Sequence, residues 1–199
     1  MSMVELVKDR HYTYADYLTW NDDKRREIIN GVVYEMAAPT LTHQRIVMWL
    51  SNRLYNFIEG RNEERICEIF VSPVDVRLAK NQFDDIIVQP DLIMVCDPAK
   101  LEDDRCCTGV PDMAVEIVSK SSAQRDRIIK LNLYRKAGVR EYWIVDPEEK
   151  TVMVCLLDDG KYVVNAYGYG YDEEGEPLPD VIPVTILEGC EIHLSEIFS

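Results

Sequence analysis

The sequence predicts one α/β domain over residues 1–199, with strands gathered between two long helices. Apolar runs of strand length follow one another in the middle of the chain, and segments with helical spacing lie before and after them. The length is enough for one domain with a substantial core. The sequence contains no repeat and no convincing linker, which argues against a division into several domains.

The N-terminal part supplies the first helices. Residues 12–20 (YTYADYLTW) predict a short helix, and residues 25–37 (RREIINGVVYEMA) predict a helix end or turn at Asn-Gly that leads into a strand. Residues 40–60 predict a long helix, with Thr42 as its N-cap and Gly60 as its stop. The apolar positions of this helix recur every three or four residues, at Ile46, Leu50, Leu54 and Phe57.

The rest of the chain is richer in strands. Strands are predicted over residues 65–71, 73–79, 86–96 and 111–119, with a polar loop over residues 100–110. The elements that follow are a helix over 122–138 closed by Gly138, a strand over 141–146, a hairpin over 151–168 with Asp-Gly at its tip, a loop over 167–180 and a short helix over 194–199.

The net charge of −14 counts against a protein that coats nucleic acid indiscriminately, because such proteins are usually basic. The charge is uneven: residues 120–140 hold seven bases and one acid, whereas residues 146–199 hold thirteen acids and two lysines. The basic run is interpreted either as a solvated helix face or as a surface that meets phosphates. The acidic tail and the Asp158-Asp159-Gly160 turn are expected to play no part in catalysis.

The six cysteines are scattered, with Cys106 and Cys107 adjacent and no CxxC spacing. This pattern predicts reduced thiols in the cytoplasm rather than a disulfide framework or a zinc site. No apolar run approaches the roughly 20 residues that cross a membrane. The N-terminus is mixed and polar, unlike a signal peptide.

Two acids stand in apolar strands. Asp91 follows Pro90 at the start of a buried run, and Glu116 shares one strand face with Ala114 and Val118. If the two strands are neighbours, the carboxylates converge and repel each other unless a cation or a proton lies between them. A hard divalent cation, Mg²⁺ or Mn²⁺, suits such oxygen ligands. The alternative is a pair of salt bridges to nearby Arg or Lys.

Lys130 projects from a mainly apolar stripe of the helix that follows. On a wheel of about 100° per residue, Ala123, Leu133, Tyr134 and Ala137 fall within about 60° of it, whereas Ile128 and Leu131 point elsewhere. Lys130 is therefore interpreted either as a snorkelling lysine or as a lysine turned toward the two carboxylates.

The chain carries two acids on two predicted strands and a lysine on the helix that follows. In this arrangement it resembles the PD-(D/E)XK nuclease superfamily. Within it, the chain resembles a large bacterial family of restriction-endonuclease-like proteins, long described as a domain of unknown function. The most specific stretches are QPDLIMV, PDMAVEIVSKSS and KLNLYRKAGVREYWIVDP, and REIINGVVYEM followed by THQRI also matches. The resemblance implies a restriction-endonuclease-like fold with a central mixed sheet flanked by helices and an added C-terminal β-hairpin.

The resemblance also implies roles for individual residues. Asp91 and Glu116 would hold Mg²⁺ or Mn²⁺, with a backbone carbonyl beside Glu116 as a third ligand. The sequence departs from the superfamily pattern at Val118, where a lysine is usual, and the family is thought to supply Lys130 from the helix instead, with Lys120 and nearby arginines as rivals. Glu27 matches an additional acid that would complete the metal shell. His43 matches a family histidine and is expected to be structural.

The function predicted from the resemblance is a metal-dependent endonuclease that hydrolyses phosphodiester bonds in DNA. One alternative is a catalytically silent binding or assembly protein on a nuclease fold, since fold alone does not establish activity. A third is a metal-dependent hydrolase of a small phosphate substrate. A homodimer is expected, because cutting both strands with one metal site per chain needs two chains and because residues 161–175 are rich in tyrosine, an interface residue.

Overall fold

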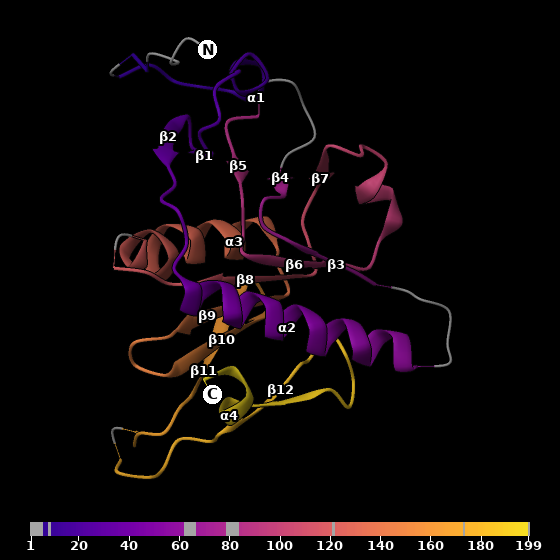
Figure 1. Ribbon diagram of the computed structural model, residues 1–199, viewed down its shortest axis with the longest axis vertical. Coiled ribbons are helices and arrows are strands. Elements are labelled where there is room, and N and C mark those ends of the chain that lie inside the picture. The colour runs from indigo at the N-terminus through magenta and orange to yellow at the C-terminus, as the bar shows by residue number, and fades with distance from the viewer. Residues whose placement is uncertain are drawn as a thin grey trace.

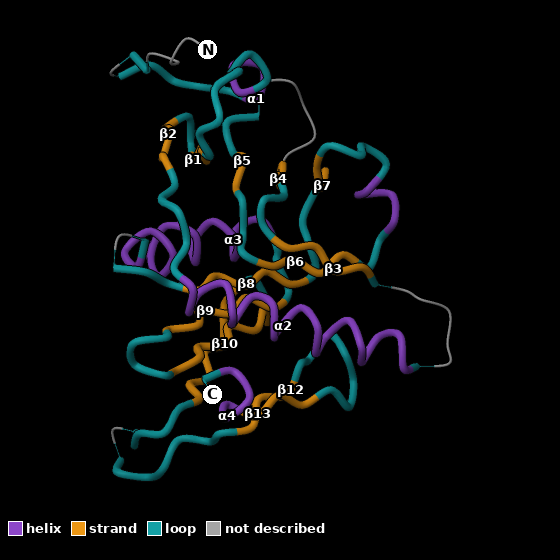
Figure 2. Tube along the Cα trace, viewed as in Figure 1, coloured by secondary structure: helices purple, strands orange, loops and turns teal. Residues whose placement is uncertain are grey.

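The structure is a computed structural model that describes residues 6–7, 9–61, 67–78, 84–120, 122–172 and 174–198. Two β-sheets lie one above the other along the long axis, and the two longest helical segments lie beside the lower sheet (Figures 1 and 2). The helices are α1 (Tyr14–Tyr17), α2 (Leu41–Gly60), α3 (Leu131–Ala137) and α4 (Leu194–Ile197). Two further helical turns are η1 (Pro98–Leu101), a 3-10 helix, and η2 (Arg125–Lys130), a π-helix.

The lower sheet has six strands in the order β11-β10-β9-β8-β6-β3. These strands are β3 (Glu68–Val71), β6 (Leu92–Val95), β8 (Met113–Ile117), β9 (Glu141–Asp146), β10 (Thr151–Asp158) and β11 (Lys161–Tyr167). β8 and β9 run parallel, and the other neighbouring pairs run antiparallel, so this sheet is mixed.

The upper sheet has five strands in the order β2-β1-β5-β4-β7. These strands are β1 (Arg26–Ile29), β2 (Val32–Glu35), β4 (Asp75–Arg77), β5 (Ile87–Val88) and β7 (Cys106–Thr108). Toward the C-terminus, β12 (Val181–Pro183) and β13 (Glu191–His193) form a separate antiparallel pair.

Two apolar layers cover the faces of the six-stranded sheet. The layer that contains the buried side of α2 includes Leu50, Leu54, Val115 and Ile117. The layer that contains the buried side of α3 includes Ala114, Val118 and Tyr134. The alternation predicted for β8 is confirmed, because its even-numbered and odd-numbered apolar residues belong to different layers.

The predicted fold class is confirmed: a mixed sheet lies between helices, and a C-terminal hairpin is present. The predicted hairpin is β10–β11, which turns at Asp159-Gly160 with both residues at positive φ. The pair β12–β13 adds a second antiparallel unit that the sequence did not predict, because strands of three residues carry too short a pattern.

Several local predictions were wrong. The run 86–96 is not one strand, because the Gln89-Pro90-Asp91 segment interrupts it and the two halves pair in different sheets. The N-cap of α2 is Thr40 rather than Thr42, since the Thr40 hydroxyl accepts a hydrogen bond from the His43 amide. Residues 26–29 form a strand rather than a helix end, and the predicted loop 100–110 contains the end of η1 and all of β7.

The cysteine prediction was also wrong in one respect. Cys67 and Cys96 form a disulfide between two neighbouring antiparallel strands, because each lies one position beyond the Glu68–Val95 pair that links β3 to β6. Cys106, Cys107, Cys155 and Cys190 are free and buried. Scattered cysteines of a mixed chain give no pairing signal, because only the strand register places these two side by side.

Within the described part of the chain, no helix combines the length and apolar character that crossing a bilayer would require.

Candidate active site

Asp91 and Glu116 lie opposite each other on neighbouring strands. Leu92 of β6 pairs with Val115 of β8 in antiparallel register, so the residue before Leu92 faces the residue after Val115. Both side chains are almost completely buried, at 7% and 3% exposure. The convergence that the sequence predicted for two acids in apolar strands is therefore present.

Asp91 uses one carboxylate oxygen for contacts within the protein. Its Oδ2 accepts a hydrogen bond from the Ile117 amide at 2.8 Å and lies 3.0 Å from Nε2 of His43, which comes from the first turn of α2. A carboxylate acceptor favours the ring tautomer with hydrogen on Nε2. Asp91 Oδ1 accepts no hydrogen bond from any residue that the structure describes.

Lys130 lies between two acids. Its ammonium nitrogen is 2.7 Å from Glu116 Oε1 and 2.6 Å from Glu27 Oε1, and the side chain is 1% exposed. Burial alone would lower the pKa of Lys130, but the carboxylates of Glu116, Glu27 and Asp126 raise it above its ordinary value. Lys130 is therefore a permanently charged donor, and it is turned toward the sheet rather than toward solvent.

The pKa of Glu116 is also raised, which for an acid favours the neutral form. Burial raises its pKa well above the ordinary value, and Lys130 opposes that rise while the surrounding carboxylates add to it. Its Oε1 accepts hydrogen bonds from Lys130 and from the Tyr134 hydroxyl, the latter at 3.0 Å. Within the described residues, Oε2 of Glu116 has no hydrogen-bond partner.

Glu27 stands behind the lysine. Its Oε1 accepts a hydrogen bond from the Gln89 amide at 2.8 Å and forms the ion pair with Lys130, and its Oε2 lies 3.5 Å from Nε of Arg125. Glu27 is fully buried and does not line the cavity beside the other two acids. The geometry thus places Glu27 in contact with the lysine; a role in a metal shell stays a prediction.

Sequence reasoning missed Arg125, Asp126 and Tyr134 as members of this cluster. Arg125 lies five residues before Lys130 in η2, where the wider π-helical turn brings residues five apart to the same side. Asp126 lies four residues before Lys130, which the α-helical wheel already places on the same side. The wheel of 100° per residue assumes an α-helix and separates Arg125 from Lys130 by about 140°. Asp126 is 2% exposed, and burial raises its pKa. The composition RDRIIK carries no signal for a π-turn.

A cavity of about 630 Å³ gives access to the cluster. Its walls include Asp91, Glu116, Asp126, Lys130 and His43. The cluster takes His43 from the first turn of α2 and Asp126 and Lys130 from η2. Asp91, Glu116 and Lys130 therefore share one hollow; their catalytic and metal-binding roles stay predictions.

The buried charges do not balance. Four carboxylates (Glu27, Asp91, Glu116, Asp126) face three cations (Arg25, Arg125, Lys130), which leaves a formal charge of −1 when His43 is counted as neutral. Unpaired buried charge is costly, so the cluster needs either a proton or a cation. A divalent cation bound to Asp91 Oδ1 and Glu116 Oε2 would offset it.

The donor set fits Mg²⁺ or Mn²⁺ of low protein coordination. Among the described residues, no three or more His, Cys, Asp or Glu side chains are arranged to hold a metal ion. A magnesium ion nevertheless keeps several waters and is commonly bound by one or two carboxylates. The two free carboxylate oxygens at the cavity meet that requirement.

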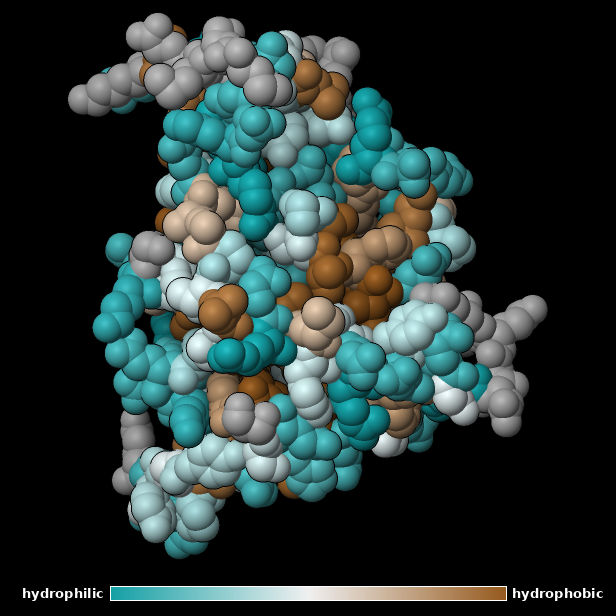
Figure 3. Space-filling view, viewed as in Figure 1, coloured by the Kyte–Doolittle hydropathy of each residue, from teal (hydrophilic) through white to brown (hydrophobic). Residues whose placement is uncertain are grey.

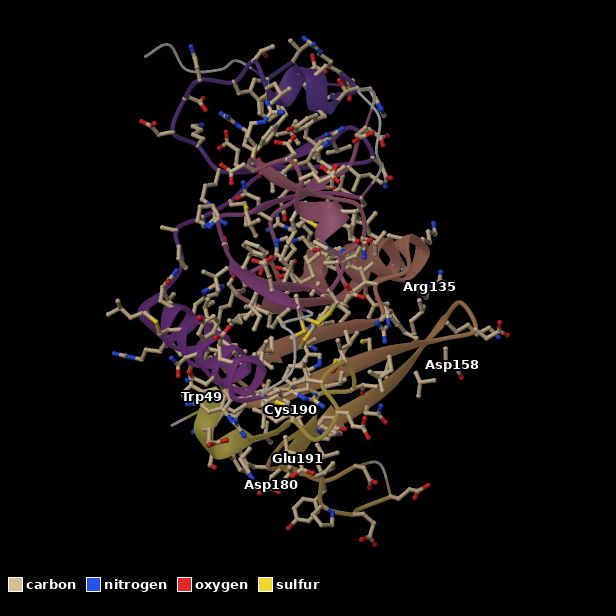
Figure 4. The ribbon with its side chains drawn as sticks, turned by 90° about the vertical axis from the view of Figure 1, so that its right-hand side faces the viewer. Trp49, Arg135, Asp158, Asp180, Cys190 and Glu191 are labelled. Carbon is tan, nitrogen blue, oxygen red and sulfur yellow. A yellow bond between two sulfur atoms is a disulfide. The ribbon has the colours of Figure 1, made fainter. Side chains whose placement is uncertain are left out.

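The basic run 120–140 is largely neutralised within the protein. Its ion pairs are Lys120–Glu148, Arg125–Glu27, Arg127–Asp146, Lys130 with Glu27 and Glu116, and Arg140–Asp112. Arg135 donates to the Gly160 carbonyl near the outer end of the β10–β11 hairpin, where Figure 4 also shows Asp158. The run does not form one continuous free positive face.

Comparison with a solved structure defines the class of fold. The chain is similar to the crystal structure of "a putative nuclease belonging to DUF820" from Anabaena variabilis, with a TM-score of 0.71. The match covers 94% of this chain and 97% of that chain at 17% sequence identity. The fold is therefore restriction-endonuclease-like, as the sequence predicted.

The chain belongs to the Uma2 family, described as "Putative restriction endonuclease", whose family model matches residues 14–194. It is also similar to "Uncharacterized protein sll1609" of Synechocystis sp., with 26% identity over 148 residues. These residues are 72% of this chain and 80% of that relative. The family resemblance seen in the sequence is thus confirmed.

Proposed function

We propose that the protein is a metal-dependent endonuclease that hydrolyses phosphodiester bonds in DNA. One observation carries the proposal: Asp91 and Glu116 line one cavity, and each keeps a carboxylate oxygen without a hydrogen-bond partner among the described residues. A purely structural salt-bridge cluster would instead pair both oxygens. Membership of a family described as "Putative restriction endonuclease" supports the same conclusion.

The chain's own groups have separable tasks. Asp91 and Glu116 would hold Mg²⁺ or Mn²⁺ through Oδ1 and Oε2. Such an ion lowers the pKa of a bound water and neutralises charge on a phosphate oxygen. Lys130, kept charged by its carboxylate neighbours, donates to a substrate oxygen at the cavity wall, and Glu27 keeps its ammonium in place.

A catalytically silent binding protein is the second candidate. The observation that favours it is the neutralised basic run together with the net charge of −14, which leaves little positive surface for a duplex. The face seen in Figure 3 is mostly hydrophilic, with an apolar area over β3 and β6.

A nicking assay separates the two candidates. Supercoiled plasmid with Mn²⁺ or Mg²⁺ should be nicked by the wild type and not by Asp91→Ala, with EDTA abolishing the reaction. Calorimetric titration with Mn²⁺ should show binding to the wild type and none to Asp91→Ala. Metal binding without nicking would favour the silent protein, and equal Mn²⁺ binding by both proteins would reject the metal site.

A homodimer and a cytoplasmic location belong to the same proposal. The dimer would give one metal site for each strand of a duplex. The thiol argument for the cytoplasm is weakened by the Cys67–Cys96 disulfide, because disulfides are rare in that compartment, and it now rests on the four free cysteines.

A further inference from the structure

Arg25 is a cation of the cavity wall that forms no direct ion pair with a described residue. It lines the same cavity as Asp91, Glu116 and Lys130. Within the described residues, no carboxylate oxygen lies within the 4.0 Å ion-pair distance of its guanidinium. The other basic side chains of the wall differ: Lys120, Arg125 and Lys130 each pair with a glutamate.

Neutral side chains hold this guanidinium in place. Its Nε donates to Gln89 Oε1 at 3.0 Å, and its Nη2 donates to the Ser72 hydroxyl. Gln89 is fixed in turn, because its amide nitrogen donates to Asp75 Oδ1 at 2.8 Å and to the Tyr17 hydroxyl at 3.2 Å. Arg25 Nη1 makes no hydrogen bond with any described residue.

The anchors of Arg25 adjoin Asp91. Gln89 lies two residues before Asp91, and the Ser72 amide donates to the Asp91 carbonyl at 3.0 Å. The positive charge is therefore held at a fixed place beside the carboxylate that is proposed to bind the metal. Asp75, which accepts from the same Gln89, attracts this cation only from beyond ion-pair distance. An anionic ligand in direct contact would therefore stabilise the partly buried cation further.

We propose that Arg25 binds a phosphate oxygen of a nucleic-acid strand, beside the scissile position. That the phosphate belongs to a nucleic-acid strand rests on the proposed function, whereas the binding of a phosphate by Arg25 does not. A planar guanidinium with a free Nη1 suits a phosphate oxygen better than an ammonium does. With the basic run neutralised, Arg25 would supply much of the positive charge that retains the substrate.

Binding can be measured without metal or catalysis. The probe is a short fluorescein-labelled single-stranded DNA in EDTA, followed by fluorescence anisotropy over a series of salt concentrations. Arg25→Gln should weaken binding by about tenfold or more, since a charged hydrogen bond is lost. It should also flatten the salt dependence by about 0.7 in log–log slope, which is the share of one phosphate contact.

Matched variants and a matched probe sharpen the test. Arg45→Gln removes the same charge from the exposed side of α2 and should change affinity less than about twofold. Ser72→Ala keeps the charge but removes one anchor, so it should weaken binding a few-fold with an unchanged salt slope. A methylphosphonate probe of the same sequence, which lacks backbone charge, should bind weakly and equally to the wild type and Arg25→Gln.

Each contrary outcome overturns the inference: no binding by the wild type at low salt, equal effects of Arg25→Gln and Arg45→Gln, or an Arg25 effect that persists with methylphosphonate. If Arg25→Gln fails to fold, unchanged binding by Ser72→Ala overturns it instead. Arg25-dependent binding without plasmid nicking would reject the nuclease and keep this inference. If nicking requires Asp91 but the Arg25→Gln variant binds DNA normally, the nuclease proposal is kept and this inference is rejected.

Discussion

At the scale of single residues, the two oxygens of Asp91 do different things. Oδ2 is held by the Ile117 amide and by His43, while Oδ1 faces the cavity. Because the same carboxylate is bonded to β8 and to the first turn of α2, its rotation is fixed by two separate elements. His43 therefore orients the proposed metal ligand, and partners of this kind tune metal affinity.

We predict that His43→Leu lowers Mn²⁺ affinity by about 10–100-fold, because Asp91 loses a donor that orients it. His43→Gln should stay within a few-fold of the wild type, since its side-chain amide can still donate to Oδ2. Calorimetric titration measures both values, and thermal unfolding shows whether the variants are folded. Wild-type affinity in a folded His43→Leu variant would contradict the orienting role.

The residues that the sequence could reveal are those out of place in their pattern. Asp91 and Glu116 stood out as acids in apolar strands, and Lys130 as a cation on an apolar stripe. Tyr134 and Arg25 did not, because a tyrosine on a buried helix face and an arginine before a strand are ordinary. Only the fold shows that Tyr134 donates to Glu116 and that Arg25 has no carboxylate of a described residue within ion-pair distance.

At the scale of elements, η2 explains why the helix was only partly predicted. Its end at Gly138 was correct, because Gly138 adopts φ of 97°, which glycine tolerates. Its first part is a π-turn in which Arg125 and Lys130 pair with acids from elsewhere in the chain. The local periodicity of the sequence carries no information about contacts between residues that are far apart in the chain.

The β3–β6 pair supports an element-scale prediction. The Cys67–Cys96 disulfide joins strands 29 residues apart in sequence. Closing a loop of this length stabilises a protein by about 3–4 kcal/mol in the chain-entropy account. We predict that a reductant lowers the free energy of unfolding by that order, measured by urea unfolding followed through the fluorescence of buried Trp143.

The matched control is the double variant Cys67→Ser/Cys96→Ser, which keeps the other four cysteines. It should unfold like the reduced wild type and should not respond to reductant. A wild-type unfolding midpoint that is the same with and without reductant would show that the strand pair does not depend on the bond.

At the scale of the whole molecule, the tyrosine-rich C-terminal segment divides into two sets. Tyr162 and Tyr167 turn inward, the first donating to the Val139 carbonyl and the second only 9% exposed. Tyr169 and Tyr171 are 55% and 74% exposed. Large exposed aromatic side chains are enriched at interfaces, so only these two support the proposed dimer.

We predict a homodimer that depends on these two side chains. Sedimentation velocity at micromolar concentration should show a species of twice the 23.0 kDa chain mass. Tyr169→Ser/Tyr171→Ser should dissociate it, whereas Tyr55→Ser, which alters an exposed tyrosine on α2, should not. A wild-type protein that sediments only as one chain would reject the dimer and favour nicking of single strands.

The wide spacing of the cluster along the chain has a consequence for the order of synthesis. Glu27 precedes Lys130 by 103 residues, from β1 to η2. At about 5–20 residues per second, Lys130 is added to the growing chain on the order of 5–20 s after Glu27. The parallel pairing of β8 with β9 closes later still, since β9 follows Lys130. A nascent or truncated chain that ends before residue 130 thus carries the acids without Lys130. The proposed hydrolytic activity would therefore arise only in a fully synthesised and folded chain.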